Sequence, residues 1–345
     1  MKIAVVTSSP PFSDGGHLVI ARALVDALKD AGHSSELVTT PQNRLGRQGA
    51  AYLAAWLTDL GLTVEDLSVD RVISLRYPAY AIRHPNHVCW LTHTIREYYD
   101  LWDKFSAPLS WKGRLKENFR RKMIRATDRH LLRRNVKRVF VISETVQARL
   151  QNYLDVESEV LYPPPPPRSY RFDEYGDYIF AVSRLTTLKR LSLLIEALAR
   201  PQASGVNCVI AGEGGEEEVL RSAIQRNRLS DRVKLIGRID DDALVDHLAK
   251  CRAVCFPPLD EDYGFVTVEA FASRKPVITC VDSGGPTELV HDGIEGFVCA
   301  PTPDSLASAI SRIMTERALS VQMGEKAHAV AREMSWERIV KTLLR

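Results

Sequence analysis

Short apolar runs with the residue types of β-strands alternate with helical patterns along this sequence, and the alternation recurs in both halves. In the first half, a helix is expected over residues 18–28, and strands are expected over 3–6, 36–39, 88–92 and 139–143. In the second half, strands are expected over 178–182, 207–211, 233–236, 253–256 and 276–279. Because this alternation is typical of parallel, doubly wound sheets, we predict an α/β fold with two Rossmann-like domains.

Five consecutive prolines, Pro163–Pro167, separate the two halves. Proline lacks an amide hydrogen and joins neither a helix interior nor a sheet ladder, so the run favours stiff polyproline II. We interpret it as a hinge or spacer between a first domain, residues 1–165, and a second domain, residues 166–332. A docking motif for a proline-binding module is the alternative, although such motifs usually lie in longer disordered tracts.

Length and composition agree with two ordinary globular domains, because 345 residues correspond to about two domains of usual size. The chain is 45% hydrophobic and 26% charged, and no apolar run approaches the roughly 18 residues that span a bilayer. The start, MKIAVVT, is expected to form a first strand and not a signal peptide. We therefore expect a cytoplasmic protein.

The six cysteines are scattered, and no pair shows the Cys-x2-Cys pattern typical of zinc sites. Cys251 and Cys255 are the nearest pair, one helical turn apart beside an expected strand. We expect most cysteines to be buried free thiols, and we expect no metal site.

The segment EDYGFVTVEA follows the expected strand 253–256, at the sheet edge where open α/β folds bind ligands. A helix is expected to begin near Gly264, and the first helix amides, of Gly264, Phe265 and Val266, form an anion site because they lack intrahelical acceptors. Glu269 would reach a ribose diol and Glu261 a sugar hydroxyl, so the set fits a nucleoside-diphosphate sugar. A helix with two solvated acids is the alternative.

With its two glutamates eight positions apart, this segment resembles the Glu-x7-Glu signature of retaining glycosyltransferases of the GT-B fold, sequence family 4. The resemblance implies two Rossmann-like domains that face each other across a cleft, the first on the acceptor side and the second binding the donor. It also implies that a closing helix, about residues 333–345, packs back on the first domain. Trp336, Ile339 and Leu343 give that helix an apolar stripe.

The stretch AVSRLTTLKR resembles the family's Gly-Arg-x4-Lys-Gly element, whose two cations hold the donor diphosphate. The resemblance assigns this role to Arg184 and Lys189, whose fixed charge would stabilise the leaving nucleotide. Ser183 and Arg190 stand where glycines are usual, so the loop geometry differs from the pattern. Arg190 could equally be a solvated surface residue.

Three further turns resemble parts of the family pattern. Gly212 lies in a Gly-x-Gly turn that lines the nucleotide cleft in the family, and Arg238 and Ile239 stand where the base is bracketed. Gly15 and Gly16 stand where a glycine pair approaches the diphosphate. Ordinary turns are the alternative in each case. The first loop has neither the dinucleotide fingerprint nor a Walker lysine, which argues against a nicotinamide dehydrogenase and a P-loop nucleotidase.

The segment HVCWLTHTIREYYDLW resembles a Trp-Leu-x-His-x-x-Arg-x-x-Tyr-Asp-Leu-Trp block of a subset of the family. In those relatives the histidine contacts the donor sugar, so the resemblance assigns this role to His93. Arg96, Tyr99 and Asp100 are candidates for the acceptor side. A purely structural histidine after a strand is the alternative reading of His93.

Residues 111–138 contain twelve Lys or Arg and two acidic residues, a net charge of +10, whereas the whole chain carries +3. On a helical wheel, Leu115, Phe119 and Met123 share one arc and basic residues share another, which indicates an amphipathic basic helix. Three interpretations stay open: packing on the sheet with a solvated basic face, docking on anionic lipid headgroups or a lipid-phosphate acceptor, and nucleic-acid binding. No nucleic-acid module accompanies the helix, so nucleic acid is not an expected partner.

The resemblance thus implies a retaining, metal-independent hexosyltransferase-type enzyme that uses a UDP- or GDP-sugar as co-substrate and needs no prosthetic group. Its acceptor would be a hydroxyl-bearing glycan, a lipid-linked molecule or a small molecule, in glycan, cell-envelope or glycolipid biosynthesis. If the segment 111–138 docks on anionic lipid, the protein would lie on the inner face of the membrane as a peripheral protein. A noncatalytic sugar-nucleotide-binding subunit and a sugar-nucleotide epimerase of the same fold are the alternatives. The predicted catalytic residues are His93, Glu261, Arg184 and Lys189, and the predicted donor-binding residues are Gly15, Gly16, Gly212, Arg238, Ile239, Gly264, Phe265, Val266 and Glu269.

Overall fold

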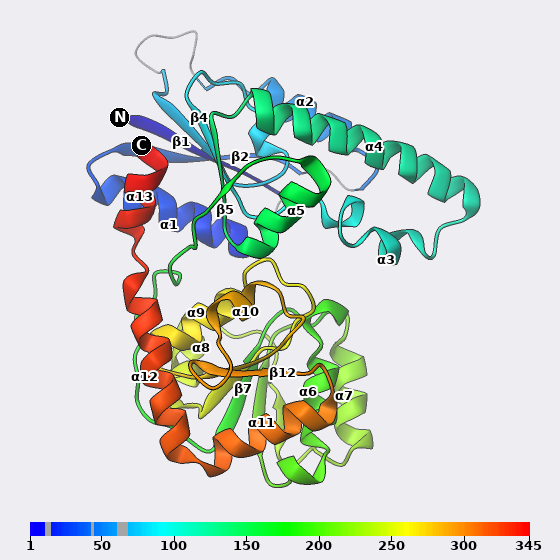
Figure 1. Ribbon diagram of the computed structural model, residues 1–345, viewed down its shortest axis with the longest axis vertical. Coiled ribbons are helices and arrows are strands. Elements are labelled where there is room, and N and C mark those ends of the chain that lie inside the picture. Colours follow the sequence, from blue (N-terminus) through cyan, green and yellow to red (C-terminus); the bar gives the residue numbers. More distant parts are fainter. Residues whose placement is uncertain (11–14, 43–44, 61–67) are drawn as a thin grey trace. The chain divides into compact units, whose positions relative to one another are not determined.

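The computed structural model describes residues 1–10, 15–42, 45–60 and 68–345. The chain forms two compact units, one of Met1–Pro163 with Ser335–Arg345 and one of Pro164–Met334 (Figure 1). The change from the first unit to the second falls inside the proline run. In the described part of the chain, each unit contains one six-stranded sheet whose neighbouring strands are all parallel.

The sheet of the first unit has the strand order β2-β1-β3-β4-β5-β6. Its strands are β1 Lys2–Ser9, β2 Ser34–Pro41, β3 Arg71–Ser74, β4 His87–Leu91, β5 Arg138–Val141 and β6 Glu159–Val160. Its helices are α1 Gly16–Asp30, α2 Gln48–Trp56, α3 Trp102–Ser106, α4 Trp111–Arg134, α5 Glu144–Leu154 and α13 Trp336–Leu344, with short 3-10 helices η2 Ala79–Ala81 and η3 Arg96–Tyr98. The central strands β1, β3 and β4 are almost wholly buried, as expected for parallel strands covered on both faces.

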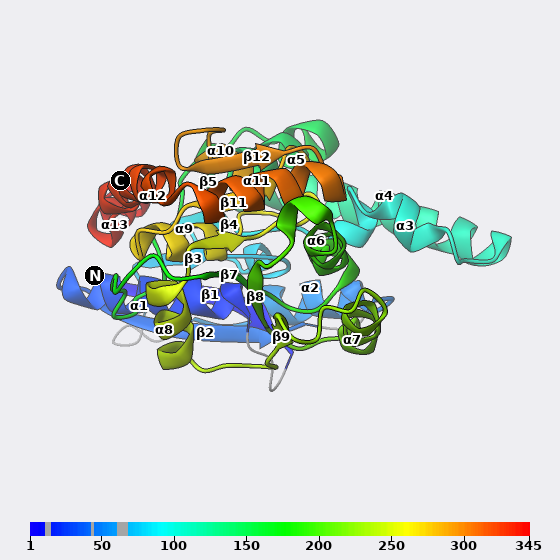
Figure 2. The same ribbon diagram turned by 90° about the horizontal axis from the view of Figure 1, so that it is seen from below.

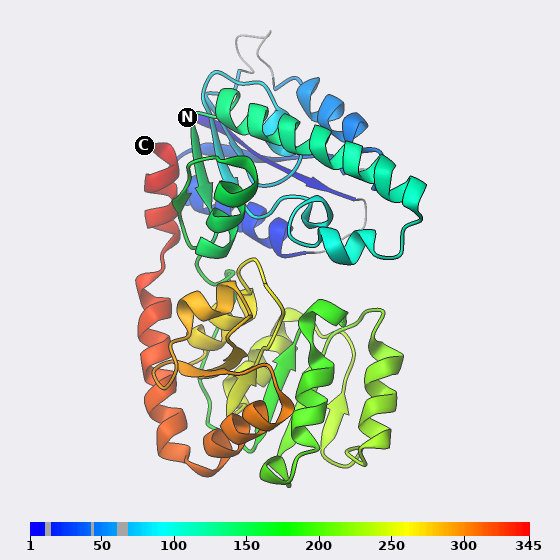
Figure 3. The ribbon, with the colours of Figure 1, turned by 45° about the vertical axis from the view of Figure 1, so that its right-hand side comes forward.

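The last helix, α13, belongs to the first unit although it follows the whole second unit in sequence (Figures 1 and 3). Ile339, Val340 and Leu343 are buried, and the helix packs against α1. Burial of such side chains stabilises a fold by roughly 1.5–3 kcal/mol each. The Trp336 ring meets the ring of Trp90 edge to face, with 6.2 Å between centroids.

The sheet of the second unit has the strand order β12-β11-β10-β7-β8-β9. Its strands are β7 Tyr178–Val182, β8 Asn207–Ala211, β9 Val233–Leu235, β10 Ala253–Cys255, β11 Val277–Cys280 and β12 Gly296–Cys299. Its helices are α6 Leu191–Leu198, α7 Glu217–Arg226, α8 Asp241–Lys250, α9 Phe265–Ala272, α10 Gly285–Leu289, α11 Pro303–Thr315 and α12 Arg317–Glu333, with 3-10 helices η4 Thr187–Lys189 and η5 Pro201–Ala203. The chain therefore leaves β7 in one direction through β8 and β9, and returns on the other side of β7 through β10, β11 and β12.

The predicted α/β class with two Rossmann-like sheets is confirmed. All nine predicted strands are present, β7 and β8 with the predicted bounds and the other seven with shifted ends. Three described strands, β3, β6 and β12, were not predicted. They are only four, two and four residues long, so they show no clear alternation. In addition, β12 begins with Gly296, a residue type that is rare in strands. Glycine is needed there because a Cβ would overlap the carbonyl oxygen of Val277 on β11.

All six cysteines are buried and free, as predicted for most of them. Burial raises the pKa of the Cys208 thiol to about 12, and it does the same for Cys89. Such thiols stay protonated and behave as small apolar side chains. None of the described helices combines the length and the hydropathy that a bilayer crossing requires.

Candidate active site

The loops after β7 and β10 meet where the strand order of the second unit changes direction. In open parallel sheets, ligands bind outside the carboxyl ends of the strands at this switch point. The loop after β7 leads into η4, and the loop after β10 carries Glu261 and leads into α9. The two loops are tied together, because the Leu259 amide donates a hydrogen bond of 2.7 Å to the Leu188 carbonyl.

Lys189 and Glu261 form an ion pair at the switch point, with 2.5 Å between Nζ and Oε2. Lys189 is only 9% exposed, and its ammonium also lies 5.3 Å from the ring centroid of Phe256. An ammonium with so little water needs a counter-charge, so the pair fixes both side chains. The structure thus brings together two predicted catalytic residues that lie 72 positions apart in sequence.

The backbone around Glu261 is held by the loop after β11. The Glu261 amide donates to the Ser283 carbonyl at 2.8 Å, and the Gly285 amide donates to the Glu261 carbonyl at 2.9 Å. A Cβ on Gly284 would lie 2.6 Å from the Glu261 carbonyl oxygen, so only glycine permits this approach. The loop geometry of Glu261 therefore depends on a glycine pair from a different strand.

The helix α9 starts next to Gly264, as predicted. Gly264 has φ 81°, a left-handed conformation that favours glycine. A Cβ there would lie 2.7 Å from Cε1 of Phe256 and 3.0 Å from Cγ of Pro286. The amides of Gly264, Phe265 and Val266 find no acceptor within the described part of the chain, as is usual for a helix N-terminus. They are the amides predicted to form an anion site.

Glu269, one turn inside α9, is 6% exposed and already has partners. Arg168 Nη1 lies 2.5 Å from Glu269 Oε1, and the Tyr170 hydroxyl donates to the same oxygen at 3.4 Å. Burial raises the pKa of the Glu269 carboxyl, against the opposing effect of the Arg168 charge. Arg168 and Tyr170 were not predicted as site residues. They lie just after the proline run, 101 and 99 positions from Glu269, where no sequence motif points to them.

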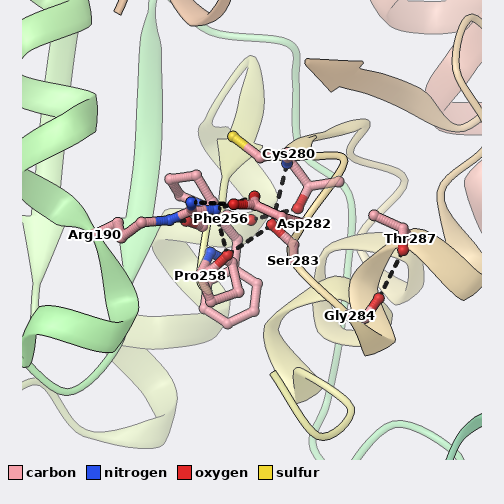
Figure 4. Close-up of polar contacts among 10 residues, drawn as sticks. Arg190, Phe256, Pro258, Cys280, Asp282, Ser283, Gly284 and Thr287 are labelled. Atoms are coloured by element: carbon pink, nitrogen blue, oxygen red, sulfur yellow. Dashed lines mark hydrogen bonds and ion pairs between the residues drawn. The ribbon is translucent and has the colours of Figure 1, made fainter. Parts of the chain in front are cut away.

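Arg190 is not the solvated surface residue that its position allowed (Figure 4). Its guanidinium makes two hydrogen bonds to the Asp282 carboxylate, at 2.7 and 2.6 Å, and two more to the carbonyls of Pro257 and Pro258. Arg190 has φ 49°, in the left-handed region, which explains why glycine is usual at this position of the family pattern. The side-chain contacts of Arg190 join the loops after β7, β10 and β11, and they offset the energetic cost of its left-handed backbone conformation. The Arg190 guanidinium lowers the pKa of the Asp282 carboxyl.

The Gly-x-Gly turn after β8 packs against the loop after β7. A Cβ on Gly212 would overlap the Ser183 carbonyl oxygen, and a Cβ on Gly214 would overlap that of Leu185. The Leu185 amide also donates to the Glu213 carbonyl at 2.9 Å. These glycines are therefore required by the close approach of two loops, and a contact of Gly212 with a nucleotide stays a prediction.

Arg184 and Arg238 expose their side chains at the same sheet edge. Arg184 follows β7, and Arg238 follows β9 with its guanidinium 3.5 Å from the Glu213 carboxylate. Ile239, next to Arg238, is partly buried. Arg184 therefore lies at the switch point, whereas Arg238 and Ile239 follow the edge strand β9. The predicted roles of all three toward the diphosphate and the base stay predictions.

The remaining predicted residues lie in the first unit. His93 follows β4, and its Nδ1 lies 2.8 Å from the Thr94 carbonyl oxygen. Gly15 is the N-cap of α1 with an extended φ of −167°, and Gly16 is the first residue of that helix. The two glycines therefore lie at a helix N-terminus, and their contact with the diphosphate stays a prediction. Residues 11–14 of the predicted loop lie outside the described residues.

All three acceptor-side candidates, Arg96, Tyr99 and Asp100, make contacts within the first unit. Tyr99 is 2% exposed, and its hydroxyl donates to Asp128 at 2.5 Å, so it is not available to an acceptor. The Asp100 carboxylate accepts from Nε of Arg96 at 2.8 Å and lies 3.6 Å from Nε of Arg149. In the part of the chain that the structure describes, no three His, Cys, Asp or Glu side chains are grouped so that they could hold a metal ion.

Comparison with known proteins finds a family match in the second unit. Residues 167–330 match the family model of the glycosyl transferases group 1. Human alpha-1,3/1,6-mannosyltransferase ALG2 is 29% identical over 171 residues, which cover 45% of this chain and 41% of ALG2. The alpha-D-kanosaminyltransferase of Streptomyces kanamyceticus is 30% identical over 153 residues, 43% of this chain and 39% of that protein. The chain thus matches less than half the length of either relative.

The likeness to solved structures extends over the whole chain. The crystal structure of Anabaena Alr3699/HepE in complex with UDP and glucose has a TM-score of 0.73 and 18% identity, and the match covers 99% of both chains. At this identity the likeness shows the fold alone, and it agrees with the predicted GT-B architecture. The chain therefore has the GT-B fold, and its residues 167–330 match the family model of the group 1 glycosyl transferases.

Proposed function

We propose that this protein transfers a sugar from a nucleoside-diphosphate sugar to a hydroxyl acceptor, with retention of the anomeric configuration. The observation that carries the proposal is the Lys189–Glu261 ion pair beside the N-terminus of α9, at the switch point of a group 1 glycosyl transferase domain. A diphosphate needs cations and N–H donors, whereas a sugar needs carboxylate partners for its hydroxyls. The loop after β10 supplies the carboxylate of Glu261, and it contacts Lys189 and leads into the N-terminus of α9, which supply the cation and the N–H donors.

The donor diphosphate is assigned to the first amides of α9, to Lys189 and to Arg184. Negative charge develops on the leaving diphosphate as its bond to the anomeric carbon breaks, and pre-positioned cations and amides stabilise that charge. Glu261 holds Lys189 and orients the hydroxyls of the sugar. The acceptor oxygen bonds to the anomeric carbon on the face that the diphosphate leaves, and the departing phosphate takes the acceptor proton.

The ribose of the donor is assigned to Glu269. Its carboxylate is held by Arg168 and Tyr170, so a ribose diol would meet an oriented acceptor group at little further cost in side-chain entropy. Uracil or guanine would lie near Arg238 and Ile239 after β9. Because the HepE structure is a complex with UDP, UDP is preferred over GDP as the first nucleotide to test.

The acceptor is a hydroxyl-bearing glycan, a lipid-linked molecule or a small molecule, and the first unit is proposed to bind it. His93 is proposed to contact the donor sugar. The reaction is proposed to need no metal ion, because Lys189, Arg184 and the α9 amides supply the positive potential at the diphosphate. A peripheral position on a membrane is proposed for the protein through segment 111–138.

The experiment is a panel of UDP- and GDP-sugars, first by thermal shift and then by donor turnover with and without a chelator. A ligand at 100 times its Kd adds about 2.7 kcal/mol of stability, so a binding donor is readily detected. The proposal expects one donor to stabilise the protein and to be cleaved slowly by water, without loss of rate in the chelator. Binding without cleavage favours a noncatalytic subunit, an epimerised donor favours an epimerase, and either result would overturn the transfer reaction.

A further inference from the structure

One face of α4 leaves large apolar side chains in solvent. Trp111 is 73% exposed, Leu115 66%, Phe119 69% and Met123 55%. These four residues, which we call the apolar stripe, are four positions apart and so line one side of the N-terminal half of the helix. Figure 2 shows α3 and α4 extending beyond the strands at one end of the first unit. Exposed apolar patches of this kind mark interaction surfaces.

The opposite face anchors the helix in the first unit. Its buried residues all lie in the C-terminal half of α4; they are Ile124, Asp128, Leu131 and Leu132. Asp128 is fully buried and accepts hydrogen bonds from the hydroxyls of Tyr52, Tyr80 and Tyr99. This anchoring fixes the rotation of the helix, so the apolar stripe points away from the core. Packing of the apolar stripe on the sheet, which the sequence left open, is therefore wrong.

Basic side chains flank the apolar stripe and continue beyond it. Lys112, Lys116 and Lys122 are exposed along the same helix. Further toward the C-terminal end, a surface groove of about 520 Å³ is lined mainly by cations, among them Lys122, Arg125, Arg129, Arg133 and Arg134. The Arg125 guanidinium is held in place by the Tyr153 ring, 4.6 Å from its centroid. None of the residues that line the groove is acidic.

The exposed face of α4 is thus apolar toward its N-terminal end and cationic toward its C-terminal end. Helices that lie in a membrane interface have this composition, because bulky apolar residues enter between the lipids while Lys and Arg contact the headgroup phosphates. A second copy of the chain is a poor occupant, since contact would bring together two segments of net charge +10. An uncharged apolar partner would leave the cations without counter-charge.

We propose that α4 docks this protein on an anionic phospholipid surface, with the apolar stripe inserted among the lipids and the cationic groove on their phosphates. This inference rests on the membrane position proposed above and names its lipid and its contact residues. It does not depend on the donor site, because the α4 residues have no part in that site. It places the protein at a surface where a lipid-linked acceptor would be concentrated.

The experiment is co-sedimentation of the full chain with vesicles of phosphatidylcholine alone and with about one third phosphatidylglycerol. Binding is expected only with the anionic lipid. It should weaken when salt rises from about 0.1 M to about 1 M, since the Debye length falls from about 10 Å to about 3 Å. Inorganic phosphate at matched ionic strength should weaken binding no more than sodium chloride does. Stronger competition by phosphate, with no vesicle binding at low salt, would mean a site for a soluble anion and would overturn membrane docking.

Two sets of variants separate the apolar and the charged contributions. Phe119→Ser with Leu115→Ser should reduce vesicle binding roughly tenfold or more through lost apolar burial. Lys112→Glu with Lys116→Glu should reduce it at least fivefold per position, since each cation near an anionic surface contributes about that factor. Leu57→Ser, at a residue 65% exposed elsewhere in the first unit, is the matched control and should bind as the unchanged protein does. All variants should keep the donor binding and the thermal stability of the unchanged protein.

Trp111 supplies a direct readout. Its fluorescence should shift to the blue when anionic vesicles are added, and Trp111→Phe should lose this shift while keeping most of the binding. Equal binding to neutral and anionic vesicles, indifference to the Phe119 and Leu115 substitutions, or binding to duplex DNA that outcompetes vesicles would each refute the proposal. So would a dimer in solution that the Phe119→Ser substitution dissociates.

Discussion

Replacing Glu269 by Gln separates the structural role of this carboxylate from its proposed role in ribose binding. Glu269 is 6% exposed and pairs with Arg168, whose side chain is 14% exposed. Loss of one partner of a buried ion pair costs about 3–5 kcal/mol. Here Arg168 keeps Asp241, with 2.9 Å between Nε and Oδ1, so about 1–3 kcal/mol is expected. Urea unfolding measures this change, and Arg168→Met combined with Glu269→Gln should recover much of the loss.

The same substitution should weaken donor binding by a separable amount. A hydrogen bond from a ribose hydroxyl to an ionised carboxylate contributes about 1.5–3 kcal/mol, which corresponds to roughly 10- to 100-fold in Kd. Titration calorimetry would compare the nucleoside diphosphate with its 2′,3′-dideoxy analogue. The unchanged protein should discriminate between the two, and the Glu269→Gln variant should bind both about equally. If the variant still discriminates as strongly as the unchanged protein, Glu269 does not bind the ribose.

Three other perturbations test how the loops and α4 are held. Burial raises the pKa of Asp128 to about 6, so the folded chain binds its proton more tightly than the unfolded chain. The unfolding free energy should then fall by about 3 kcal/mol as pH rises from about 4 to about 6, and Asp128→Asn should remove this fall in pH-dependent urea unfolding. Gly264→Ala, at φ 81° and with its Cβ 2.7 Å from Phe256, should cost about 1–3 kcal/mol and weaken donor binding in thermal shift; unchanged stability would contradict the packing. Arg190→Lys cannot reproduce the two bonds to Asp282 and should lower kcat with a loss of about 1.5–3 kcal/mol of stability, and normal kinetics would show that the loop contacts do not position the site.

Local chemistry explains why the positions of several candidate site residues could be predicted from sequence. The start of α9 depends on a glycine with positive φ, and Glu261 and Glu269 have fixed places before and inside that helix. The parallel sheet then puts the ends of β7 and β10 side by side, which is why Lys189 reaches Glu261. The conformational preference of glycine and the rule that ligands bind at the switch point of a parallel sheet are sufficient to place these residues.

Other features depend on tertiary contacts that leave no local pattern. Arg168 is 101 positions from Glu269 and belongs to no motif, so its contact with that carboxylate appears only in the folded chain. The helical period of segment 111–138 predicted an apolar face and a basic face, but it did not show which side of the helix packs on the rest of the first unit. That choice is made by Asp128, a charged residue that sequence reasoning places in solvent and that three tyrosine hydroxyls hold in the core.

The proposed reaction is tested most directly by proton NMR of the anomeric signals while the purified protein turns over its preferred nucleoside-diphosphate sugar. The first sugar product should have the anomeric configuration of the donor, and Lys189→Met and Glu261→Gln should each abolish most of the turnover while the fold stays intact. A first product of the opposite configuration, or full turnover in both variants, would contradict a retaining transfer at the Lys189–Glu261 site.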